Sequence, residues 1–420
     1  MRALSTIFLT SLPLLLFAGT VPAQWVQTNF PYVDRIVTSL AVSGTNLFAG
    51  TYSDALHAVS GACLSTDDGT SWTSVDSGKS GAVMALAVSG TNLFAGNGSG
   101  VYLSTNNGTS WTLVDSGLTN QSVWSLAVSG TNLWAGTSGG GVFLSTNNGT
   151  SWTAVNNGVP ISGSEVTSLA VSGTNLFAGT WGDGVFHLTN NGTNWTLVDS
   201  GLTGNYFHFL AFYDTNIFAG TYSGIYRSAN SRSSWIAVDS GLTNSIVYSF
   251  AVGGTSLFAG TRGGGVFLSS NNGTSWTAVN NGLTNPDVTA LAVSGSNLFA
   301  GINSNAGVFN GSVWRRPLSE MITSTKSSSS ELPVAFQLNQ NYPNPFNPST
   351  TISYQLPNQA HVTLKVFDVL GREVATLVNK LEEPGYKSVV FDGGRLATGV
   401  YNYRLQVGTY IATKRLLLLR

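Results

Sequence analysis

The segment Leu40-Ala41-Val42-Ser43-Gly44-Thr45-Asn46-Leu47-Phe48-Ala49-Gly50 decides the fold, because close copies of it return six more times along the 420 residues. Successive copies lie 40 to 46 residues apart and end at Gly96, Gly136, Gly179, Gly220, Gly260 and Gly301. Self-similarity at a period of about forty residues is the signature of a repeat architecture and takes priority over any local secondary-structure pattern. The chain therefore contains seven structural units.

Every unit places turn residues between short apolar runs. After the copy come a glycine-rich turn, an apolar run such as 141–144, the turn 145–152 that ends at a tryptophan, and a last short strand. Asn and Gly adopt turn dihedrals readily, whereas Val, Leu, Phe and Trp favour strands. Four strands in about forty residues are typical of a propeller blade, where radial repetition leaves only short sheet edges. Residues 24–317 are thus predicted to form an all-β, seven-bladed β-propeller with four-stranded blades.

The tryptophan that ends the long turn recurs at both ends of the propeller segment. It stands at Trp25, Trp72, Trp111, Trp152, Trp195, Trp235, Trp276 and Trp314. Seven blades need only seven outer strands, so one terminal strand completes the last blade. We expect the strand around Trp25 to pair with the final unit and close the ring, with the short hairpin at Trp314 as the competing closer.

The composition excludes several classes of function. Charged residues make up 9% of the chain and the net charge is −1, with 7 basic and 12 acidic residues in 24–317 against 9 and 5 in 332–420. No basic stripe is present, so a nucleic-acid partner is not expected. The four histidines lack ligand spacing, so no metal or cofactor is expected either. Cys63 occupies a position where other units have Tyr or Phe, which predicts a buried structural thiol.

The two ends of the chain differ from the repeats. Residues 1–23 combine a basic start, an apolar run at 7–18 and small residues at 21–23, which predicts an export signal. No later stretch is long and apolar enough to span a membrane. The small, polar segment 318–331 is predicted to be a flexible linker. Residues 332–420 lack Trp and contain strand candidates at 351–354, 361–368, 386–391, 400–406 and 410–418, which predicts a small Ig-like β-sandwich.

Residues 65–72, Ser-Thr-Asp-Asp-Gly-Thr-Ser-Trp, resemble the Asp-box or BNR repeat of sialidases, sortilin-type receptors and photosystem assembly factors. Five other copies have Asn in place of the Asp, at 106, 147, 190, 230 and 271. Because Asn and Asp both bond locally to the backbone, the box is predicted to stabilise the fold rather than to bind a metal or act as an acid. The structural box residues are Ser65, Asp67, Gly69, Trp72, Trp111, Trp152, Trp195, Trp235 and Trp276.

Segments 341–348, 366–374, 396–405 and 414–420 resemble, in this order, the type A C-terminal sorting domain of the type IX secretion system. The residues that carry the resemblance are Asn341, Pro343, Pro345, Asp368, Gly371, Arg372, Gly399, Tyr401, Lys414 and Arg415. It implies the type IX secretion machinery as a partner and a secreted or outer-membrane-surface protein of a Bacteroidetes-like bacterium. In that family the domain is commonly cleaved. The alternative is an ordinary Ig-like accessory domain.

Variation among the repeats gathers in the outer-to-inner crossovers and in the turns between second and third strands, which share the face opposite the boxes. The residues in or beside them are Trp124, Glu165, Trp181, Asp183, Tyr206, His208, Tyr222, Tyr248, Arg262 and Asp287. Aromatic rings with a few polar groups can stack on sugars or anchor a protein partner. We therefore expect a monomeric, non-catalytic binding or scaffold protein whose ligand is an extracellular glycan or a surface protein.

Two alternatives stay open. A secreted, sialidase-like glycoside hydrolase would need carboxylates that flank the scissile bond, and the spacing of Glu165, Asp183 and Asp287 singles out no pair. The arginine cluster and the Arg-Ile-Pro segment typical of sialidases are missing, so no catalytic residue is expected. The rings can also simply pack between blades, as in a scaffold without a discrete ligand.

Overall fold

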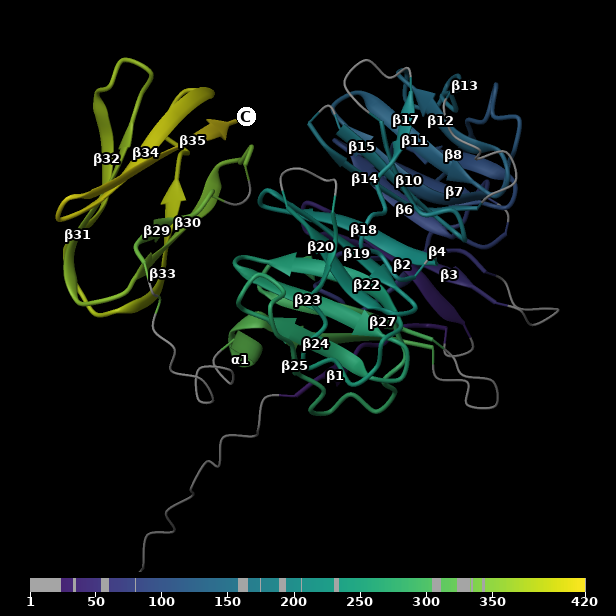
Figure 1. Cartoon of the computed structure of the whole chain (residues 1–420). Helices are drawn as coiled ribbons and strands as arrows, with labels where there is room; N and C mark the ends of the chain where they lie inside the picture. The colour runs from purple at the N-terminus through teal and green to yellow at the C-terminus, as the bar shows by residue number, and fades with distance from the viewer. Residues whose placement is uncertain are drawn as a thin grey trace, which may run out of the picture.

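The computed structural model describes residues 24–32, 35–53, 60–79, 81–157, 165–173, 175–188, 194–204, 206–229, 234–303, 311–322, 333, 335–341 and 344–419. In these residues, 28 strands form seven four-stranded antiparallel sheets around a ring, and seven further strands form a separate C-terminal domain (Figure 1). The all-β class, the seven-bladed propeller and the C-terminal β domain predicted from the sequence are confirmed.

Each blade runs from an innermost first strand to an outermost fourth strand. Blade 1 contains β2 (Ile36–Ser43), β3 (Asn46–Tyr52), β4 (Ala62–Ser65) and β5 (Thr73–Ser74); blade 2, β6 (Ala85–Ser89), β7 (Asn92–Asn97), β8 (Gly100–Ser104) and β9 (Thr112–Leu113); blade 3, β10 (Val123–Ser129), β11 (Asn132–Thr137), β12 (Gly141–Ser145) and β13 (Thr153–Ala154); blade 4, β14 (Val166–Ser172), β15 (Asn175–Thr180), β16 (Val185–Leu188) and β17 (Trp195–Leu197); blade 5, β18 (Phe207–Tyr213), β19 (Asn216–Thr221), β20 (Gly224–Ser228) and β21 (Ile236–Ala237); blade 6, β22 (Val247–Gly253), β23 (Ser256–Thr261), β24 (Gly265–Ser269) and β25 (Thr277–Ala278); blade 7, β26 (Val288–Ser294), β27 (Asn297–Ile302), β28 (Val313–Pro317) and β1 (Val26–Gln27).

In six of the seven repeat copies, the glycine that ends the copy lies where one blade packs against the next. A Cβ atom placed on Gly136 would lie 2.6 Å from Cγ1 of Val166, and one on Gly301 would lie 2.5 Å from Cγ1 of Val37. These separations are shorter than van der Waals contact, so a side chain at either position would push the blades apart. The second contact joins blade 7 to blade 1, and the ring is therefore closed at its core.

The ring is also closed at its rim, by strands from both ends of the propeller. β1 pairs with β28, with Val26 opposite Arg315, as predicted for the strand around Trp25. The interpretation of Trp314 is wrong: Trp314 stands opposite Ala300 in the third strand, as Phe143 stands opposite Ala135 in blade 3. Its indole belongs to the series of third-strand side chains and not to the series of turn tryptophans.

Cys63 belongs to the same third-strand series. It stands opposite Ala49 and is fully buried, as predicted. Burial raises the pKa of its thiol to about 12. The thiol therefore stays protonated at neutral pH and fills core space.

The propeller extends beyond the boundary expected at Pro317. Leu318–Ile322 form helix α1, where a linker was expected, and Met321 is fully buried in the core cluster that contains Phe258 and Trp314. Three of its five residues are apolar, but a single turn is too short for a helical period to show in the sequence. The remainder of the expected linker, 323–331, and the expected signal, 1–23, lie outside the described residues.

The C-terminal domain is a β-sandwich. One sheet contains β29 (Gln337–Leu338), β30 (Ser349–Leu356) and β33 (Gly385–Asp392); the other contains β31 (Ala360–Phe367), β32 (Glu373–Glu382), β34 (Gly399–Val407) and β35 (Tyr410–Leu418). The core between them includes Ile352, Val366 and Tyr403, each fully buried. The edge strand β32 is absent from the sequence-based strands because it is largely exposed and so lacks a clear apolar alternation.

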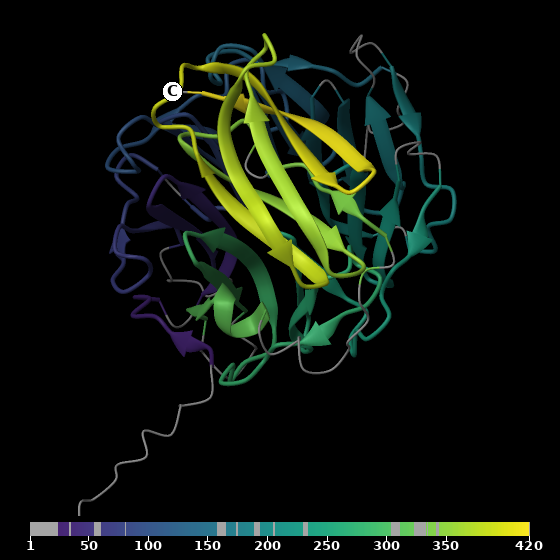
Figure 2. The same ribbon diagram turned by 90° about the vertical axis from the view of Figure 1, so that its left-hand side faces the viewer.

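Both ends of the propeller leave it on one face. The third strand of each blade ends at the long turn, and β28 ends there too, since the Leu318 amide donates to the Ser296 carbonyl in the turn before β27. β1 begins at the same end, beside Arg315. In Figure 1 the C-terminal domain lies to the left of the propeller, on the side where α1 lies, and in Figure 2 it lies in front of the ring.

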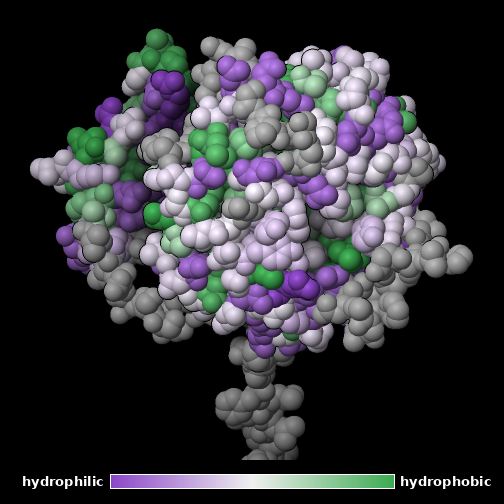
Figure 3. Space-filling view, turned by 45° about the vertical axis from the view of Figure 1, so that its right-hand side comes forward, coloured by the Kyte–Doolittle hydropathy of each residue, from purple (hydrophilic) through white to green (hydrophobic). Residues whose placement is uncertain are grey.

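The surface reflects the low charge content. Figure 3 shows mostly pale residues of intermediate hydropathy, with scattered strongly hydrophilic ones. Within the described part of the chain, none of the helical segments has the length and apolarity needed to cross a bilayer.

Candidate functional site

The turns between third and fourth strands, 65–72 in blade 1 and its equivalents, are named box turns. Asp67 Oδ1 accepts hydrogen bonds from the Ser65 hydroxyl at 2.9 Å and the Ser71 amide at 2.8 Å, and the Ser71 hydroxyl donates to Oδ2 at 2.6 Å. The bonds from Ser71, above all, lower the pKa of Asp67 to about 2. Both carboxylate oxygens of Asp67 are thus hydrogen-bonded to serines of its own turn.

An asparagine makes nearly the same network. Asn147 Oδ1 accepts from the Ser145 hydroxyl and the Ser151 amide, each at 2.9 Å, and its Nδ2 donates to the Ser151 hydroxyl at 2.9 Å. Only the direction of the bond to the serine hydroxyl is reversed. Asn106 and Asn271 repeat this pattern, whereas Asn190 and Asn230 lie outside the described residues.

The box-turn tryptophans join the blades. Six tryptophan indoles donate to a carbonyl of the preceding blade at 2.5 to 2.7 Å: Trp111 to Val75, Trp152 to Val114, Trp195 to Val155, Trp235 to Val198, Trp276 to Val238 and Trp25 to Val279. Trp72 donates instead to the Thr28 hydroxyl at 3.1 Å. All seven rings are at most 9% exposed. This face, named the box face, buries its aromatic residues.

The opposite face, named the crossover face, carries a β-bulge in the first strand of six blades. In blades 1, 4 and 7 the bulged residue is Thr38, Thr167 or Thr289, and its hydroxyl donates to a carbonyl of the following blade. In blades 3, 5 and 6 it is Trp124, His208 or Tyr248. A bulge redirects its side chain, and here it turns rings to the crossover face.

Five of the predicted ligand residues form one cluster across blades 4, 5 and 6. This aromatic patch contains Trp181, Tyr206, His208, Tyr222 and Tyr248. Ring centroids lie 4.8 Å apart for Trp181 and Tyr206, 5.7 Å for Trp181 and Tyr222, 4.8 Å for His208 and Tyr222, and 4.6 Å for His208 and Tyr248. Trp181 is 41% exposed and Tyr206 43%. The patch is thus a continuous surface held by edge-to-face and tilted contacts.

Burial and Arg262 set the charge of the patch. Burial lowers the pKa of His208 to about 4, with a smaller contribution from Arg262, so the imidazole is neutral at pH 7. Burial raises the pKa of Tyr248, to which Arg262 is hydrogen-bonded. The exposed Arg262 therefore supplies the positive charge at one side of the patch.

A buried carboxylate adjoins that side. Asp287 is 3% exposed, and its Oδ2 accepts from Asn303 Nδ2 at 3.0 Å. Burial raises the pKa of Asp287, while Asn303 and Arg262 oppose the shift. The sequence analysis missed Asn303. It follows β27 in the position that Arg262, Tyr222 and Trp181 occupy after β23, β19 and β15, so alignment of the repeats would have found it.

Three other predicted residues add no ring to the patch, although the Trp181 amide donates to the Glu165 carbonyl at 2.9 Å. Trp124 is 37% exposed on the crossover face in blade 3, and no ring contact in the described residues joins it to the patch. Asp183 lies in the turn between β15 and β16, where its amide donates to Thr180 Oγ1 at 3.1 Å. Glu165 precedes β14 and accepts from the Ser138 hydroxyl at 3.3 Å.

The segment that begins the C-terminal domain is hydrogen-bonded to the last two strands, β34 and β35. The amide of Asn341, which is 2% exposed, donates to the Tyr403 hydroxyl at 2.8 Å. Asn344, which precedes Pro345, accepts from the Leu417 amide at 2.8 Å. Arg415 is exposed and Lys414 half-buried, both on β35. Pro343 lies outside the described residues.

The other sorting residues shape turns. Asp368 Oδ1 accepts from the amides of Leu370 and Arg372 at 2.9 Å each, and Arg372 Nε donates to Oδ2 at 2.7 Å. Gly371 has a φ of 79°, which favours glycine. Gly399 begins β34, and the Tyr401 hydroxyl donates to the Ala397 carbonyl at 2.8 Å.

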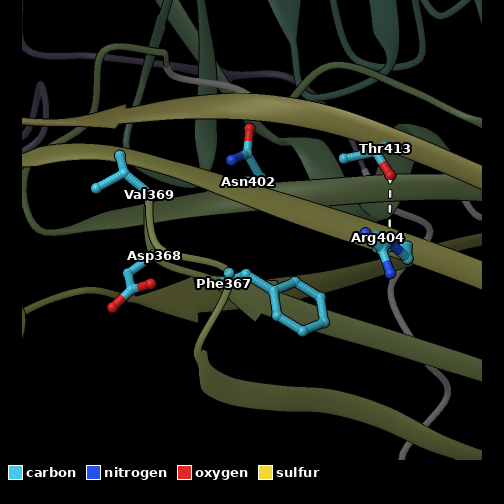
Figure 4. Close-up of a pocket in the computed structure, with 7 residues that line it drawn as sticks. Phe367, Asp368, Val369, Asn402, Arg404 and Thr413 are labelled. Atoms are coloured by element: carbon cyan, nitrogen blue, oxygen red, sulfur yellow. Dashed lines mark hydrogen bonds between the residues drawn. The ribbon is translucent and has the colours of Figure 1, made fainter.

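A shallow hollow of about 200 Å³ lies next to this turn, far along the chain from the aromatic patch. Figure 4 shows its lining of Phe367, Asp368, Val369, Asn402, Arg404 and Thr413, with Arg404 hydrogen-bonded to Thr413. The side chains of the described residues nowhere bring together three metal-ligating His, Cys, Asp or Glu groups.

Comparison with known proteins gives one result for the fold of the chain and another for its C-terminal domain. In solved structures the fold is similar to PorZ of Porphyromonas gingivalis, a bacterial surface component of the type-IX secretion system (16% identity, 92% of this chain and 59% of that chain, TM-score 0.52). It is also similar to YCF48 bound to D1 peptide (15%, 73% and 98%, 0.54) and to the WD40 beta propeller domain of Doa1 (15%, 70% and 96%, 0.53). No curated protein matches the chain.

Residues 340–418 match the family of secretion system C-terminal sorting domains. This match covers the segment in which the sequence analysis placed the sorting motif, and the resemblance is confirmed. The structural likenesses, at these identities, establish the propeller fold alone. The chain is therefore a β-propeller followed by a secretion system C-terminal sorting domain, which indicates export by type IX secretion to the surface or surroundings of a Bacteroidetes-type bacterium.

Proposed function

We propose that this protein is a non-catalytic binding protein of the bacterial exterior and that the aromatic patch holds its ligand. The observation that carries the proposal is the contact of five rings from three blades, with Trp181 and Tyr206 still more than 40% exposed. The equivalent turn positions in blades 2 and 3 are Gly98 and Ser138. Tyr52 in blade 1 and Trp124 in blade 3 are also exposed on this face, but the ring contacts found there among the described residues join only blades 4, 5 and 6.

Preorganisation favours binding by this patch. Each aromatic pair contributes about 0.5–1.5 kcal/mol beyond its burial, so the rings hold each other in place before a ligand arrives. A rigid surface loses little side-chain entropy on association. YCF48, with the same fold, is bound to a peptide, which supports a binding role for a propeller of this kind. The box turns have the Asp-box pattern, and we assign them to holding the blades together.

Hydrolysis fits the carboxylates less well. A glycosidase needs two carboxyl groups within about 5–10 Å of each other. Asp287 belongs to blade 7, whereas Glu165 and Asp183 belong to blade 4, and blades 5 and 6 lie between them. Asp287 therefore cannot pair with Glu165 or Asp183 across one glycosidic bond, which argues against a catalytic pair that includes Asp287.

Binding of the secreted protein to cell envelopes and to an array of surface glycans tests the proposal. The variant carries Trp181→Ala and Tyr222→Ala, and we expect it to lose binding by about tenfold or more, since central aromatic anchors contribute 2 kcal/mol or more each. Tyr52→Ala is the matched control, because Tyr52 occupies the position of Trp181 in blade 1 and is 37% exposed. Equal binding by the double variant and the wild type would refute the proposed face.

Mass spectrometry of the mature protein, taken from the culture medium and from the outer cell surface, tests the proposed export route. We expect a start near Gln24 and loss of the region beyond the propeller, as for cargo whose sorting domain is removed. An intact C-terminus on a protein confined to the periplasm would contradict the external location.

A further inference from the structure

Two buried acceptor atoms beside the aromatic patch have no donor. Asp287 Oδ1 and Asn303 Oδ1 are buried, and no described residue donates a hydrogen bond to either. A buried polar atom without a partner costs about 1–3 kcal/mol, and more when it is charged. Native structures pair most such atoms with protein groups, water or a ligand. Both acceptors therefore fit a site completed by a donor from outside the chain.

The two residues that carry the free acceptors are hydrogen-bonded to each other. Asn303 Nδ2 donates to the other carboxylate oxygen of Asp287 at 3.0 Å, and the Asn303 amide donates to the Asp287 carbonyl at 2.9 Å. Asn285 braces the pair: its Oδ1 accepts from the Asp287 amide at 3.0 Å, and its Nδ2 donates to the Asn303 carbonyl at 2.9 Å. The free acceptors thus belong to one fixed unit, named the acceptor pair.

The acceptor pair is continuous with the aromatic patch. Arg262 and Asp287 interact electrostatically, and Arg262 is hydrogen-bonded to Tyr248, whose ring packs against His208. His208 Nε2 is a further buried atom without a hydrogen-bond partner in the described residues. Rings and unpaired polar atoms therefore occur together on one sector of the crossover face, over blades 4 to 7.

The charges narrow the ligand class. Arg262 and Asp287 carry opposite charges that offset each other, so the two groups together favour neither a cationic nor an acidic ligand. Hydroxyl groups are neutral donors, and two neighbouring hydroxyls match two neighbouring acceptors. The apolar face of a sugar ring suits an aromatic surface.

We propose that the acceptor pair binds two hydroxyl groups of a neutral sugar unit whose ring lies on the aromatic patch. This inference rests on the proposed function and adds the ligand class and the residues that select it. Asp287 and Asn303 are then specificity residues that discriminate hydroxylated neutral glycans from charged ones.

Isothermal titration calorimetry of the secreted protein tests the inference, with dextran, mannan and galactan as neutral probes and alginate as an acidic probe. We expect binding to at least one neutral probe, a loss of about tenfold or more in Asp287→Asn and in Asn303→Ala, and none to alginate. Asp183→Asn is the matched control, an exposed carboxylate on the same face, and should bind within about twofold of wild type. Thermal melts report folding, and Asn303→Ala leaves the Asp287 carboxylate in place if Asp287→Asn does not fold.

The outcomes separate this inference from the proposed function. Loss of neutral-glycan binding in Trp181→Ala but not in Asp287→Asn and Asn303→Ala would refute the acceptor pair and leave the binding patch standing. Binding to alginate alone, or Trp181-dependent binding to cell envelopes without binding to any neutral probe, would overturn the neutral-sugar assignment. Envelope and neutral-glycan binding that is indifferent to Trp181→Ala with Tyr222→Ala would refute the patch itself.

Discussion

Trp152 and Trp181 belong to neighbouring blades and to opposite faces of the propeller, and they have opposite environments. Trp152 is 4% exposed, and its indole donates to the Val114 carbonyl of the preceding blade, whereas Trp181 is 41% exposed and its ring contacts in the described residues are with other members of the patch. The repeated box turn buries its tryptophan in every blade that contains the turn. The turn between second and third strands has no such requirement, so its residues differ from blade to blade.

The bulged positions show, within one face, the same division between residues that join blades and residues that are exposed. Thr167 uses its hydroxyl to join blade 4 to blade 5, whereas His208 and Tyr248 use the same position to place rings in the patch. Neighbouring blades contact each other at several positions, so the closed ring does not depend on the inter-blade hydrogen bond at any single bulge. Some of these positions are therefore free to serve a ligand, and the predictions below test how cleanly the two roles separate.

The largest effect is expected for Trp152→Ala. Loss of a buried indole and its hydrogen bond should lower the free energy of unfolding by about 3–5 kcal/mol, whereas Trp181→Ala should change it by less than about 1 kcal/mol because that ring is half exposed. Chemical denaturation of both variants measures the difference. Similar losses in the two variants would mean that the crossover face also holds the ring together.

Trp25→Ala should come next. Its indole repeats the box-turn bond, to the Val279 carbonyl at 2.7 Å, but the strand that follows is only two residues long. We expect a loss of about 3 kcal/mol, at the lower end of the range for a buried aromatic ring, because the chain end can relax around the gap. Hydrogen exchange should show the loss in blade 7 first. Protection that falls evenly in all blades would instead indicate that the ring opens as one unit.

Acid should affect the patch through His208. Its folded pKa of about 4 lies below the ordinary value of 6.5, so between these values the unfolded chain binds a proton that the folded chain does not. Stability should therefore fall as the pH falls from 6.5 to 4, by about 2 kcal/mol after allowance for partial exposure. His208→Gln should remove this part of the pH dependence, and His361→Gln, at an exposed site on β31, should not. Parallel melting curves at pH 7, 5.5 and 4 for all three proteins provide the measurement.

The smallest effect is expected for Asn147→Asp. The carboxylate can accept from the Ser145 hydroxyl and the Ser151 amide as Asn147 does, and Ser151 can donate its hydroxyl as Ser71 does to Asp67. The change in stability at pH 7 should stay within about 0.5 kcal/mol. Ser145→Ala, which removes the hydroxyl that binds the Gly149 amide at 2.8 Å, should cost about 1–2 kcal/mol. A larger cost for Asn147→Asp would show that charge matters in the box turn.

The repeats predicted most of the propeller because each blade is specified by its own local sequence. The copy that ends at Gly136 contains the strands, the turns and the glycine that meets Val166, so no long-range information was needed. The closing blade is different. Trp314 looks like a turn tryptophan in sequence, and only the pairing of Ala300 with Trp314 reveals a third strand.

The sequence predicted which residues belong to the candidate site, but not that five of them form one cluster. Variation among repeats pointed to Trp124 as strongly as to Trp181, and the ring geometry alone separates them. Of the acceptor pair, Asp287 was predicted from the sequence and Asn303 was missed. Its free oxygen atom is a property of packing and of hydrogen bonds among Asn285, Asp287 and Asn303, which no spacing of residue types encodes.

The shared face of the two chain ends determines how the protein is presented. β1 starts and β28 ends at the box face, so any tether attached behind Ile322 holds the propeller by that side. The aromatic patch then points away from whatever the tether is fixed to. A partner can approach that face without passing the anchor, and cutting the tether would release the propeller with that face unchanged.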